Sequence, residues 1–315
     1  MPQLQIVTGA GPVGWTIAEQ LAAQGHPVRQ LTRSGSGPEH PLVERRSVDV
    51  SRPNLLEAEF DGAAAVFHCI HGSAYSARAW AAELPAAEQA VLGAAGAAGA
   101  VVVFPESLYS YDRPQPAMAE DSPRAAAGGK RGIRTQLLRA RAASDTPTVS
   151  VAASDFFGPR VRNAHAGERM VPAVLAGKTV RVMGRPDMPH SFTYVPDLAA
   201  AMIGAAQQPG VWNSVLHAPT GPALTQEGLV RVFADAAGVS APRVGSLPGW
   251  LIRTLGIALP DLRELAETLY QFEEPFVLES GRTQSLLGLT PTPLADAAAE
   301  TVSWWRAELR RPSAA

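Results

Sequence analysis

The chain has 315 residues, one cysteine and a formal net charge of −2. This length can bury a large core, and a single cysteine allows no internal disulfide. Basic and acidic residues are interspersed, which excludes a basic face for nucleic acid or a membrane surface, and no apolar run reaches the roughly 20 residues of a membrane span. We therefore expect a soluble, cytoplasmic protein whose partner is a small molecule.

The first predicted unit is a strand, a glycine turn and a helix. The apolar residues 4–8 lead into a Gly-x-Gly-x-x-Gly motif, and a helix follows over about 15–24. In such a unit Gly9 permits the tight turn, Gly11 lets a diphosphate approach the backbone, and Gly14 lets the helix pack on the strand. The motif predicts a dinucleotide site; a glycine turn in another kind of α/β protein is the alternative. The residues expected at the diphosphate are Gly9, Gly11, Pro12, Val13 and Gly14.

The second strand, predicted over residues 27–31, leads to the adenosine end of this site. NAD-selective proteins of this kind place an acidic residue at the strand end, whereas an arginine there can accommodate the 2′-phosphate of NADP. Thr32 occupies the acidic position and Arg33 follows it, which favours NADP over NAD unless Arg33 is an ordinary surface cation. A third strand is expected over 48–50, where Asp49 would face the adenine.

The fourth and fifth strands are predicted over 63–70 and 100–104, with a helix over about 84–98 between them. His68 and His71 lie at the end of the fourth strand, and no Asp, Glu or Cys pattern completes a metal site with them. We interpret them as residues that line the cofactor cleft. Open parallel sheets place their chemistry at the carboxyl ends of strands. The polar residues just after the fifth strand are Glu106, Ser107, Tyr109 and Tyr111.

With these features the chain resembles the extended short-chain dehydrogenase/reductase family, which contains NAD(P)-dependent epimerases, dehydratases and reductases. The segments that carry the resemblance are residues 9–14, 104–111, 120–123, 155–159 and 191–199. The resemblance implies an α/β fold with a doubly wound parallel sheet (Rossmann) and a smaller mixed α/β substrate domain, often as a homodimer. The resemblance implies a nucleotide-binding domain formed by residues 1–159 and 191–219, and a substrate-binding domain formed by residues 160–190 and 220–315.

The resemblance also implies catalytic roles, with one gap. In that family a Ser or Thr after the fifth strand polarises the substrate oxygen, and a Tyr-x-x-x-Lys pair transfers the proton. Ser107 matches the serine, and Lys130, in a helix predicted over 130–143, matches the lysine that also holds the nicotinamide ribose. The residue four positions before Lys130 is Ala126, which has no proton to give. A phenol becomes a useful acid or base near neutrality only beside a stabilising cation, and here the phenol itself is missing.

Three functions remain open after this comparison. The first is an NADP-dependent reductase of a small carbonyl, enone or imine. The second is a sensor that binds NADP without turnover. The third is a cofactor-assisted epimerase or dehydratase of a sugar-like substrate. In a reductase, Tyr109, Lys130 or water would supply the proton. Tyr109 could instead line the pocket, Lys130 could serve only as a ribose contact, and Tyr111 is expected to pack on the cofactor.

The carboxyl-terminal half supplies the remaining candidates. Phe156 stacks on the nicotinamide or packs in the core, and His190 faces the substrate from the residue before a returning strand. Asp197 is expected to cap the helix over 198–206. Residues 247–272 predict a pair of helices that forms a lid or a dimer contact.

Overall fold

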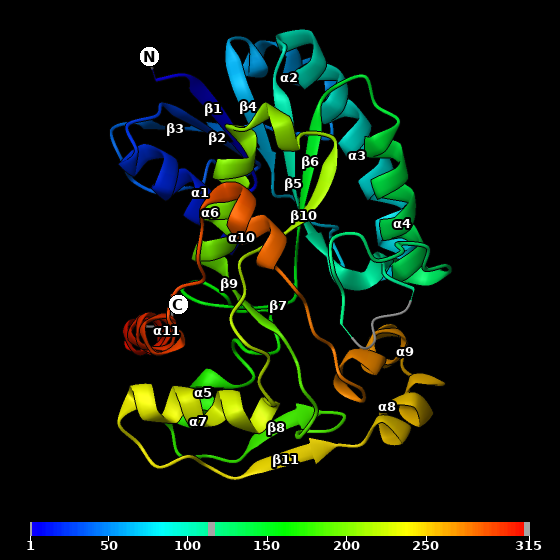
Figure 1. Ribbon diagram of the computed structural model, residues 1–315, viewed down its shortest axis with the longest axis vertical. Helices are drawn as coiled ribbons and strands as arrows, with labels where there is room; N and C mark the ends of the chain where they lie inside the picture. Colours follow the sequence, from blue (N-terminus) through cyan, green and yellow to red (C-terminus); the bar gives the residue numbers. More distant parts are fainter. Residues whose placement is uncertain (1, 113–116, 312–315) are drawn as a thin grey trace.

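The computed structural model describes residues 2–112 and 117–311, and its centre is a seven-stranded sheet (Figure 1). Every neighbouring pair is parallel, in the order β10-β6-β5-β4-β1-β2-β3. The strand order reverses direction at β1 and β4, and ligands of such sheets bind beyond the carboxyl ends of the strands at that point. The strands are β1 (Leu4–Thr8), β2 (Val28–Thr32), β3 (Val43–Ser47), β4 (Ala63–His68), β5 (Val101–Ser107), β6 (Thr148–Ala153) and β10 (Ser214–His217).

Helices cover both faces of this sheet, which confirms the doubly wound α/β fold. On one face, α1 and α6 bury Ile17 and Met202 against the strands. On the other face, α2 and α3 bury Phe60 and Val91, and α4 lies beside α3 (Figure 1). The helices are α1 (Pro12–Ala23), α2 (Pro53–Phe60), α3 (Ala77–Ala98), α4 (Gly129–Ala142) and α6 (Val195–Ala206), and a 3₁₀ turn η1 (Leu108–Ser110) follows β5.

A smaller α/β region lies below the carboxyl edge of the sheet (Figure 1). Its core packs α5, α7 and α11 against β8, around Phe233 and Trp305. Two short parallel pairs, β8 with β11 and β7 with β9, lie outside the large sheet. The strands are β7 (Asp155–Phe157), β8 (Val180–Met183), β9 (Phe192–Tyr194) and β11 (Val244–Leu247). The helices are α5 (Val171–Leu175), α7 (Gln226–Ala237), α8 (Gly249–Gly256), α9 (Pro260–Glu267), α10 (Gly281–Leu287) and α11 (Leu294–Leu309), with the 3₁₀ turns η2 (Pro209–Val211) and η3 (Leu269–Phe272).

Two local predictions are wrong. The third strand is β3 over Val43–Ser47 and not residues 48–50, because an edge strand with exposed Glu44, Arg45 and Arg46 carries no apolar pattern. Asp197 does not cap α6, which begins at Val195. Its carboxylate instead accepts hydrogen bonds from the backbone N–H and the hydroxyl of Thr292, at 2.8 and 2.6 Å.

Candidate functional site

The glycine turn between β1 and α1 has the geometry that a diphosphate requires. Gly9 has a φ of +85°, and a Cβ there would lie 2.9 Å from the carbonyl oxygen of Cys69. A Cβ on Gly14 would lie 2.1 Å from the Gly9 carbonyl oxygen, so only glycine lets α1 approach the strand this closely. Gly11 precedes Pro12, the first residue of α1, and a Cβ on Gly11 would meet nothing within 4 Å. The backbone at Gly11 is therefore open to a ligand.

The start of α1 presents unpaired backbone donors at this turn. The first intrahelical hydrogen bond runs from the Trp15 N–H to the Gly11 carbonyl at 2.9 Å, so the N–H of Val13 has no partner within the helix. Such groups, with the helix dipole, attract phosphate oxygens. The Gln30 amide donates to the Gly9 carbonyl at 2.6 Å and fixes the turn from β2. Gln30 was not predicted as a site residue, although its alternation within β2 points its side chain toward the turn.

The adenosine-end candidates lie around the carboxyl ends of β2 and β3. Thr32 is buried at the end of β2, and Arg33 follows it in an exposed position. Hydrogen bonds from Ser51 hold the pKa of the Asp49 carboxyl below its usual range, and the charge of Arg33 contributes to the same shift. These three candidates are therefore close together, and no carboxylate ends β2 itself.

Ser107 is the last residue of β5 and is held by its neighbour. Its N–H and its hydroxyl donate to Oε1 of Glu106 at 2.8 and 3.3 Å. The other oxygen of Glu106 accepts from the buried Arg141 at 2.7 Å, and Arg141 is paired in turn with Glu88 at 2.6 Å. This charged network fixes the end of β5, and the long hydroxyl bond leaves Ser107 able to turn toward a substrate oxygen.

Tyr109 is enclosed by aromatic groups just beyond Ser107. Its hydroxyl lies 2.8 Å from that of Tyr75, and its ring stacks on Trp80 with a centroid distance of 6.4 Å. Burial, together with the neighbouring Tyr75 and Asp155, raises the pKa of the Tyr109 phenol well above its usual range. A phenol in this environment is a poor proton donor near neutral pH.

Lys130 lies in the first turn of α4, and its side chain is fully buried against α9. Its Nζ donates to the carbonyl of Glu264 at 2.8 Å and lies 2.5 Å from Oε2 of Glu264 and 3.0 Å from Oε2 of Glu267. It also lies over the ring of Tyr75, 4.7 Å from the centroid. Two carboxylates therefore compensate the ammonium charge. The predicted helix pair over 247–272 is α8, α9 and η3, and α9 supplies these two acids.

Arg134, one helical turn after Lys130, lies in the candidate site and was not predicted from the sequence. Its guanidinium lies 4.7 Å from the ring centroid of Trp80, and its Nε is 3.6 Å from Oε1 of Glu106. That Nε is buried, and none of the described residues accepts a hydrogen bond from it. The four-residue spacing from Lys130 on the same helix face was the signal that could have identified it.

His71 lies beside the same tryptophan. Its ring meets Trp80 edge-on at 4.7 Å, and burial with the nearby charge of Arg134 lowers its pKa to about 4. His71 is therefore neutral near pH 7 and able to accept or donate one hydrogen bond.

Tyr111 and Phe156 make contacts within the protein interior. The Tyr111 hydroxyl pairs with Nε2 of His217 at 2.5 Å and accepts from Arg124 at 3.2 Å, in a buried network. Phe156 is partly buried and packs against the core around the large sheet.

A buried pair of Asp155 and His190 completes the site. Nε2 of His190 lies 2.7 Å from Oδ2 of Asp155, and Nδ1 lies 2.9 Å from the carbonyl of Gln271. His190 was predicted to face the substrate; it is buried, and Asp155 is the more exposed member, with 20% of its side chain accessible. Asp155 was not identified from the sequence, although it stands two residues after the end of β6.

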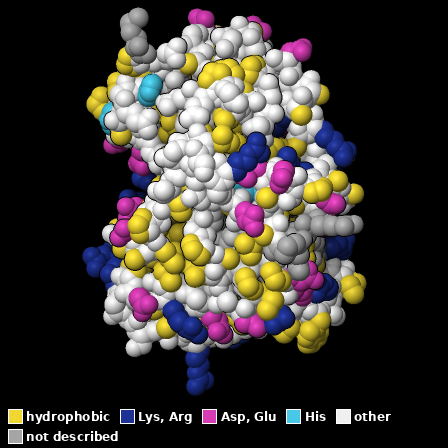
Figure 2. All heavy atoms as spheres, in the orientation of Figure 1, with side chains coloured by type: hydrophobic (Ala, Val, Ile, Leu, Met, Phe, Trp, Pro, Cys, Tyr) yellow, Lys and Arg dark blue, Asp and Glu magenta, His cyan; other side chains and the backbone are white. Residues whose placement is uncertain are grey.

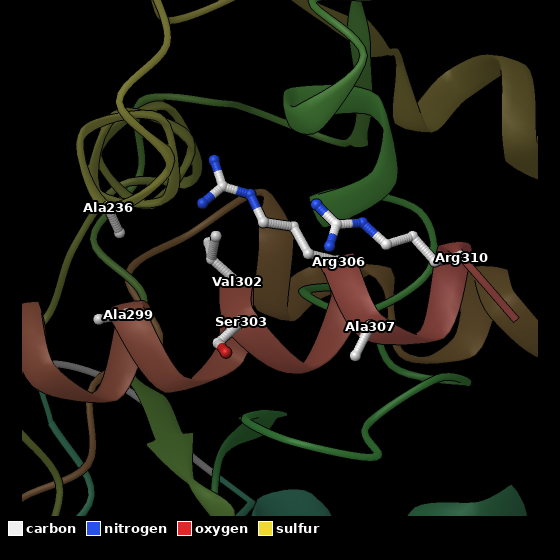
Figure 3. Close-up of a pocket in the computed structure, with 7 residues that line it drawn as sticks. All are labelled: Ala236, Ala299, Val302, Ser303, Arg306, Ala307 and Arg310. Carbon is white, nitrogen blue, oxygen red and sulfur yellow. The ribbon is translucent and has the colours of Figure 1, made fainter.

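Outside this site, the described surface carries mixed charges and a shallow pocket. Basic and acidic side chains are mixed over the face shown in Figure 2. A shallow pocket lies along α11, where Arg306 and Arg310 extend on the same side (Figure 3). Over residues 2–112 and 117–311, no group of three or more His, Cys, Asp or Glu side chains is placed to hold a metal ion. In the same residues, no helix has the length and apolarity needed to cross a membrane.

The sheet, its two helical layers and the glycine turn define a Rossmann-type α/β protein. The chain belongs to the NAD dependent epimerase/dehydratase family, which it matches over residues 5–213. No curated protein sequence matches it.

Solved structures show the same fold over the whole chain. A UDP-glucose 4-epimerase of Thermotoga maritima, solved with UDP-glucose, has a TM-score of 0.76 at 18% identity, with 98% of this chain and 100% of that chain covered. A UDP-glucuronic acid 4-epimerase of Bacillus cereus, solved with NAD, has a TM-score of 0.76 at 16% identity over the same shares. The structure of gox2253 has a TM-score of 0.80 at 21% identity, again over 98% and 100%.

Proposed function

We propose that this chain is a nicotinamide-nucleotide-dependent enzyme that acts at a hydroxyl-bearing carbon of a sugar nucleotide, as an epimerase or a dehydratase. The observation that carries the proposal is the family match over 5–213, combined with a glycine turn whose backbone is open at Gly11. Neighbouring structures contain UDP-glucose and NAD, which supports this substrate class. Of the functions expected from the sequence, the epimerase or dehydratase alternative is better supported than the reductase.

The cofactor would lie along the carboxyl edge of the sheet. Gly9, Gly11 and the start of α1 would hold the diphosphate, and His71, Phe156 and Lys130 are the candidates near the nicotinamide end. Bound there, the nicotinamide ring supplies an acceptor for a hydride and both of its electrons. We propose that residues 1–159 and 191–219 form the nucleotide-binding domain, and that residues 160–190 and 220–315 form the substrate-binding domain.

We further propose that the preferred nucleotide is NADP. Thr32 and Arg33 stand at the end of β2, where an acidic residue would select NAD. The neighbouring structures were solved with NAD, so binding of both nucleotides has to be compared directly.

A reductase of small carbonyl, enone or imine substrates is the second candidate. The observation that favours it is Ala126, which leaves no phenol four residues before Lys130 to act as the base of an epimerase. A reductase needs only a proton donor, and water or a side chain can fill that role.

One experiment separates these functions. The purified chain is incubated with NAD or NADP and, in turn, UDP-glucose, UDP-glucuronic acid and UDP-N-acetylglucosamine, and the sugars are examined by proton NMR for inverted or dehydrated carbons. A parallel set contains NADPH with aldehydes, enones and imines, followed by the loss of nicotinamide absorbance. Conversion of a sugar nucleotide supports the proposal, and absorbance loss alone supports the reductase. Nucleotide binding without either reaction would point to a sensor and overturn both.

A further inference from the structure

The contacts of His190 fix the orientation of its ring. Nδ1 lies 2.9 Å from the carbonyl oxygen of Gln271, and Nε2 lies 2.7 Å from Oδ2 of Asp155. The rings of Phe272 and Phe276 stack on the imidazole at 5.1 and 5.3 Å, so its plane is held as well.

The carboxylate of Asp155 is held ionised. Burial acts to raise the pKa of Asp155, but the hydrogen bond and charge of His190, with a smaller contribution from His165, hold it below its usual range. Oδ2 of Asp155 is engaged with His190, and no described residue hydrogen-bonds Oδ1. The carboxylate is therefore anchored by one oxygen, and its other oxygen has no protein partner among the described residues.

The pair lies at the strand end that faces Ser107. In the large sheet Ser107 pairs with Ala153, and Asp155 follows Ala153 by two residues at the same edge. Burial raises the pKa of Tyr75 and of Tyr109, and the charge of Asp155 contributes to both shifts. The other titratable or charged groups that face the pair are His165 and, beyond it, Arg169.

The other proton carriers at this edge are less suited to the task. The Tyr109 phenol is hard to ionise, and the Lys130 ammonium is shared between two carboxylates. Ser107 donates to Glu106, whose other oxygen is held by the buried Arg141. Among these groups, Asp155 combines an ionised form, an oxygen without a protein partner and a place just beyond the strand that pairs with Ser107.

We propose that Asp155 is the catalytic residue that exchanges a proton with the substrate hydroxyl, and that His190 is its positioning residue. This inference rests on the proposed function. In the oxidative direction the substrate O–H bond breaks and its proton moves to Oδ1 of Asp155. The freed electron pair forms the second C–O bond, while the C–H bond breaks and its hydride leaves to an oxidised nicotinamide nucleotide. A neutral carbonyl results, and the reverse step returns the proton.

The first test needs no turnover. In the ¹³C-labelled full chain without ligand, NMR should show that the pKa of the Asp155 carboxyl lies below its usual range, and that it rises in His190→Gln. An Asp155 pKa that is the same in wild type and His190→Gln would overturn the positioning role of His190.

The second test measures turnover of the three UDP-sugars with NAD or NADP. Asp155→Asn should lower kcat at least a hundredfold, since general acid–base groups contribute roughly 10²–10⁴-fold, while nucleotide binding by calorimetry should change less than twofold. Asp187→Asn is the matched control, because Asp187 is an exposed partner of Arg185. A loss of kcat below tenfold in Asp155→Asn would overturn this proposal alone. No turnover by the wild type would overturn the proposed function, and this inference with it.

His190→Gln separates positioning from structure. Without the hydrogen bond of His190 the pKa of Asp155 should rise, so the acid limb of kcat for sugar oxidation should move to higher pH. A loss of activity with an unmoved limb would contradict the role of His190. If this variant does not fold, Asp155→Asn and the titration of Asp155 in the wild type decide the proposal.

Discussion

Lys130 and Glu264 lie 134 positions apart in the chain, yet their side chains form a hydrogen-bonded ion pair of 2.5 Å. The pair joins the first turn of α4, beside the large sheet, to α9 of the smaller region. Glu267 adds a second carboxylate at 3.0 Å. The lysine that the resemblance places at a cofactor thus also holds the two regions together.

Lys130→Met tests this structural contribution. The substitution leaves two carboxylates without their cation, and because these are about one-quarter exposed we expect a loss of about 1–3 kcal/mol in the free energy of unfolding, below the cost of breaking a fully buried pair. Urea unfolding of the wild type and of Lys130→Met measures this loss. Lys178→Met is the control, since Lys178 is exposed at the end of the α5 loop. Equal stabilities of the two variants would show that the pair contributes nothing.

The glycines of the first turn should separate binding from folding. In Gly14→Ala the new Cβ would lie 2.1 Å from a backbone oxygen, so α1 must move and both stability and nucleotide binding should fall. In Gly11→Ala the Cβ meets nothing within 4 Å of the protein. It occupies the space through which a diphosphate approaches, and we expect near-normal urea unfolding with at least tenfold weaker binding of NAD and NADP by calorimetry. Normal binding of NAD and NADP by Gly11→Ala would show that the diphosphate does not lie at this turn.

The sequence predicted this turn because everything that forms it is local. Gly9, Gly11 and Gly14 are within six positions, and each has a separate steric reason to be glycine. The parallel sheet was also predictable, since its buried strands are short apolar runs. The edge strand β3 was not, because its side chains are charged and exposed.

The proposed catalytic arrangement depends on contacts that spacing does not encode. Asp155 and His190 come from segments 35 positions apart, and their pairing follows from the parallel contact of β7 with β9. The environment of Lys130 depends on α9, whose sequence predicted only an amphipathic helix. Arg134 was accessible to sequence reasoning through its helical spacing from Lys130, as Gln30 was through its alternation within β2.

Arg33→Ala tests the choice of nucleotide. A guanidinium that pairs with the 2′-phosphate makes charged hydrogen bonds worth roughly 1.5–3 kcal/mol, so the Kd of NADPH should rise about 10-fold or more. NADH lacks this phosphate, and its Kd should change less than threefold. Arg46→Ala is the control, because Arg46 is an exposed β3 residue paired with Glu44. Equal weakening of both nucleotides by Arg33→Ala would show that Arg33 does not bind the 2′-phosphate.

The buried His68 should make the protein sensitive to mild acid. Its Nδ1 pairs with the Thr8 hydroxyl at 2.9 Å, and burial lowers its pKa from 6.5 to about 4. Because the folded chain keeps this ring neutral, the unfolded chain binds more protons between pH 6.5 and 4, and stability is lost as the pH falls through this window. The contribution of His68 between pH 7.5 and 5 is about 2 kcal/mol of unfolding free energy.

His68→Gln removes that titration, and comparison of the two pH dependences isolates it. Urea unfolding at pH 7.5 and at pH 5 should show a loss for the wild type that exceeds the loss for His68→Gln by about 2 kcal/mol. His71, whose pKa is also lowered to about 4, still titrates in the variant, so the acid sensitivity should decrease without disappearing. His40→Gln, at an exposed position, should follow the wild type. Equal losses in wild type and His68→Gln would mean that the folded protein accommodates a charged ring at position 68, which its contact with Thr8 and its burial between the sheet and α3 argue against.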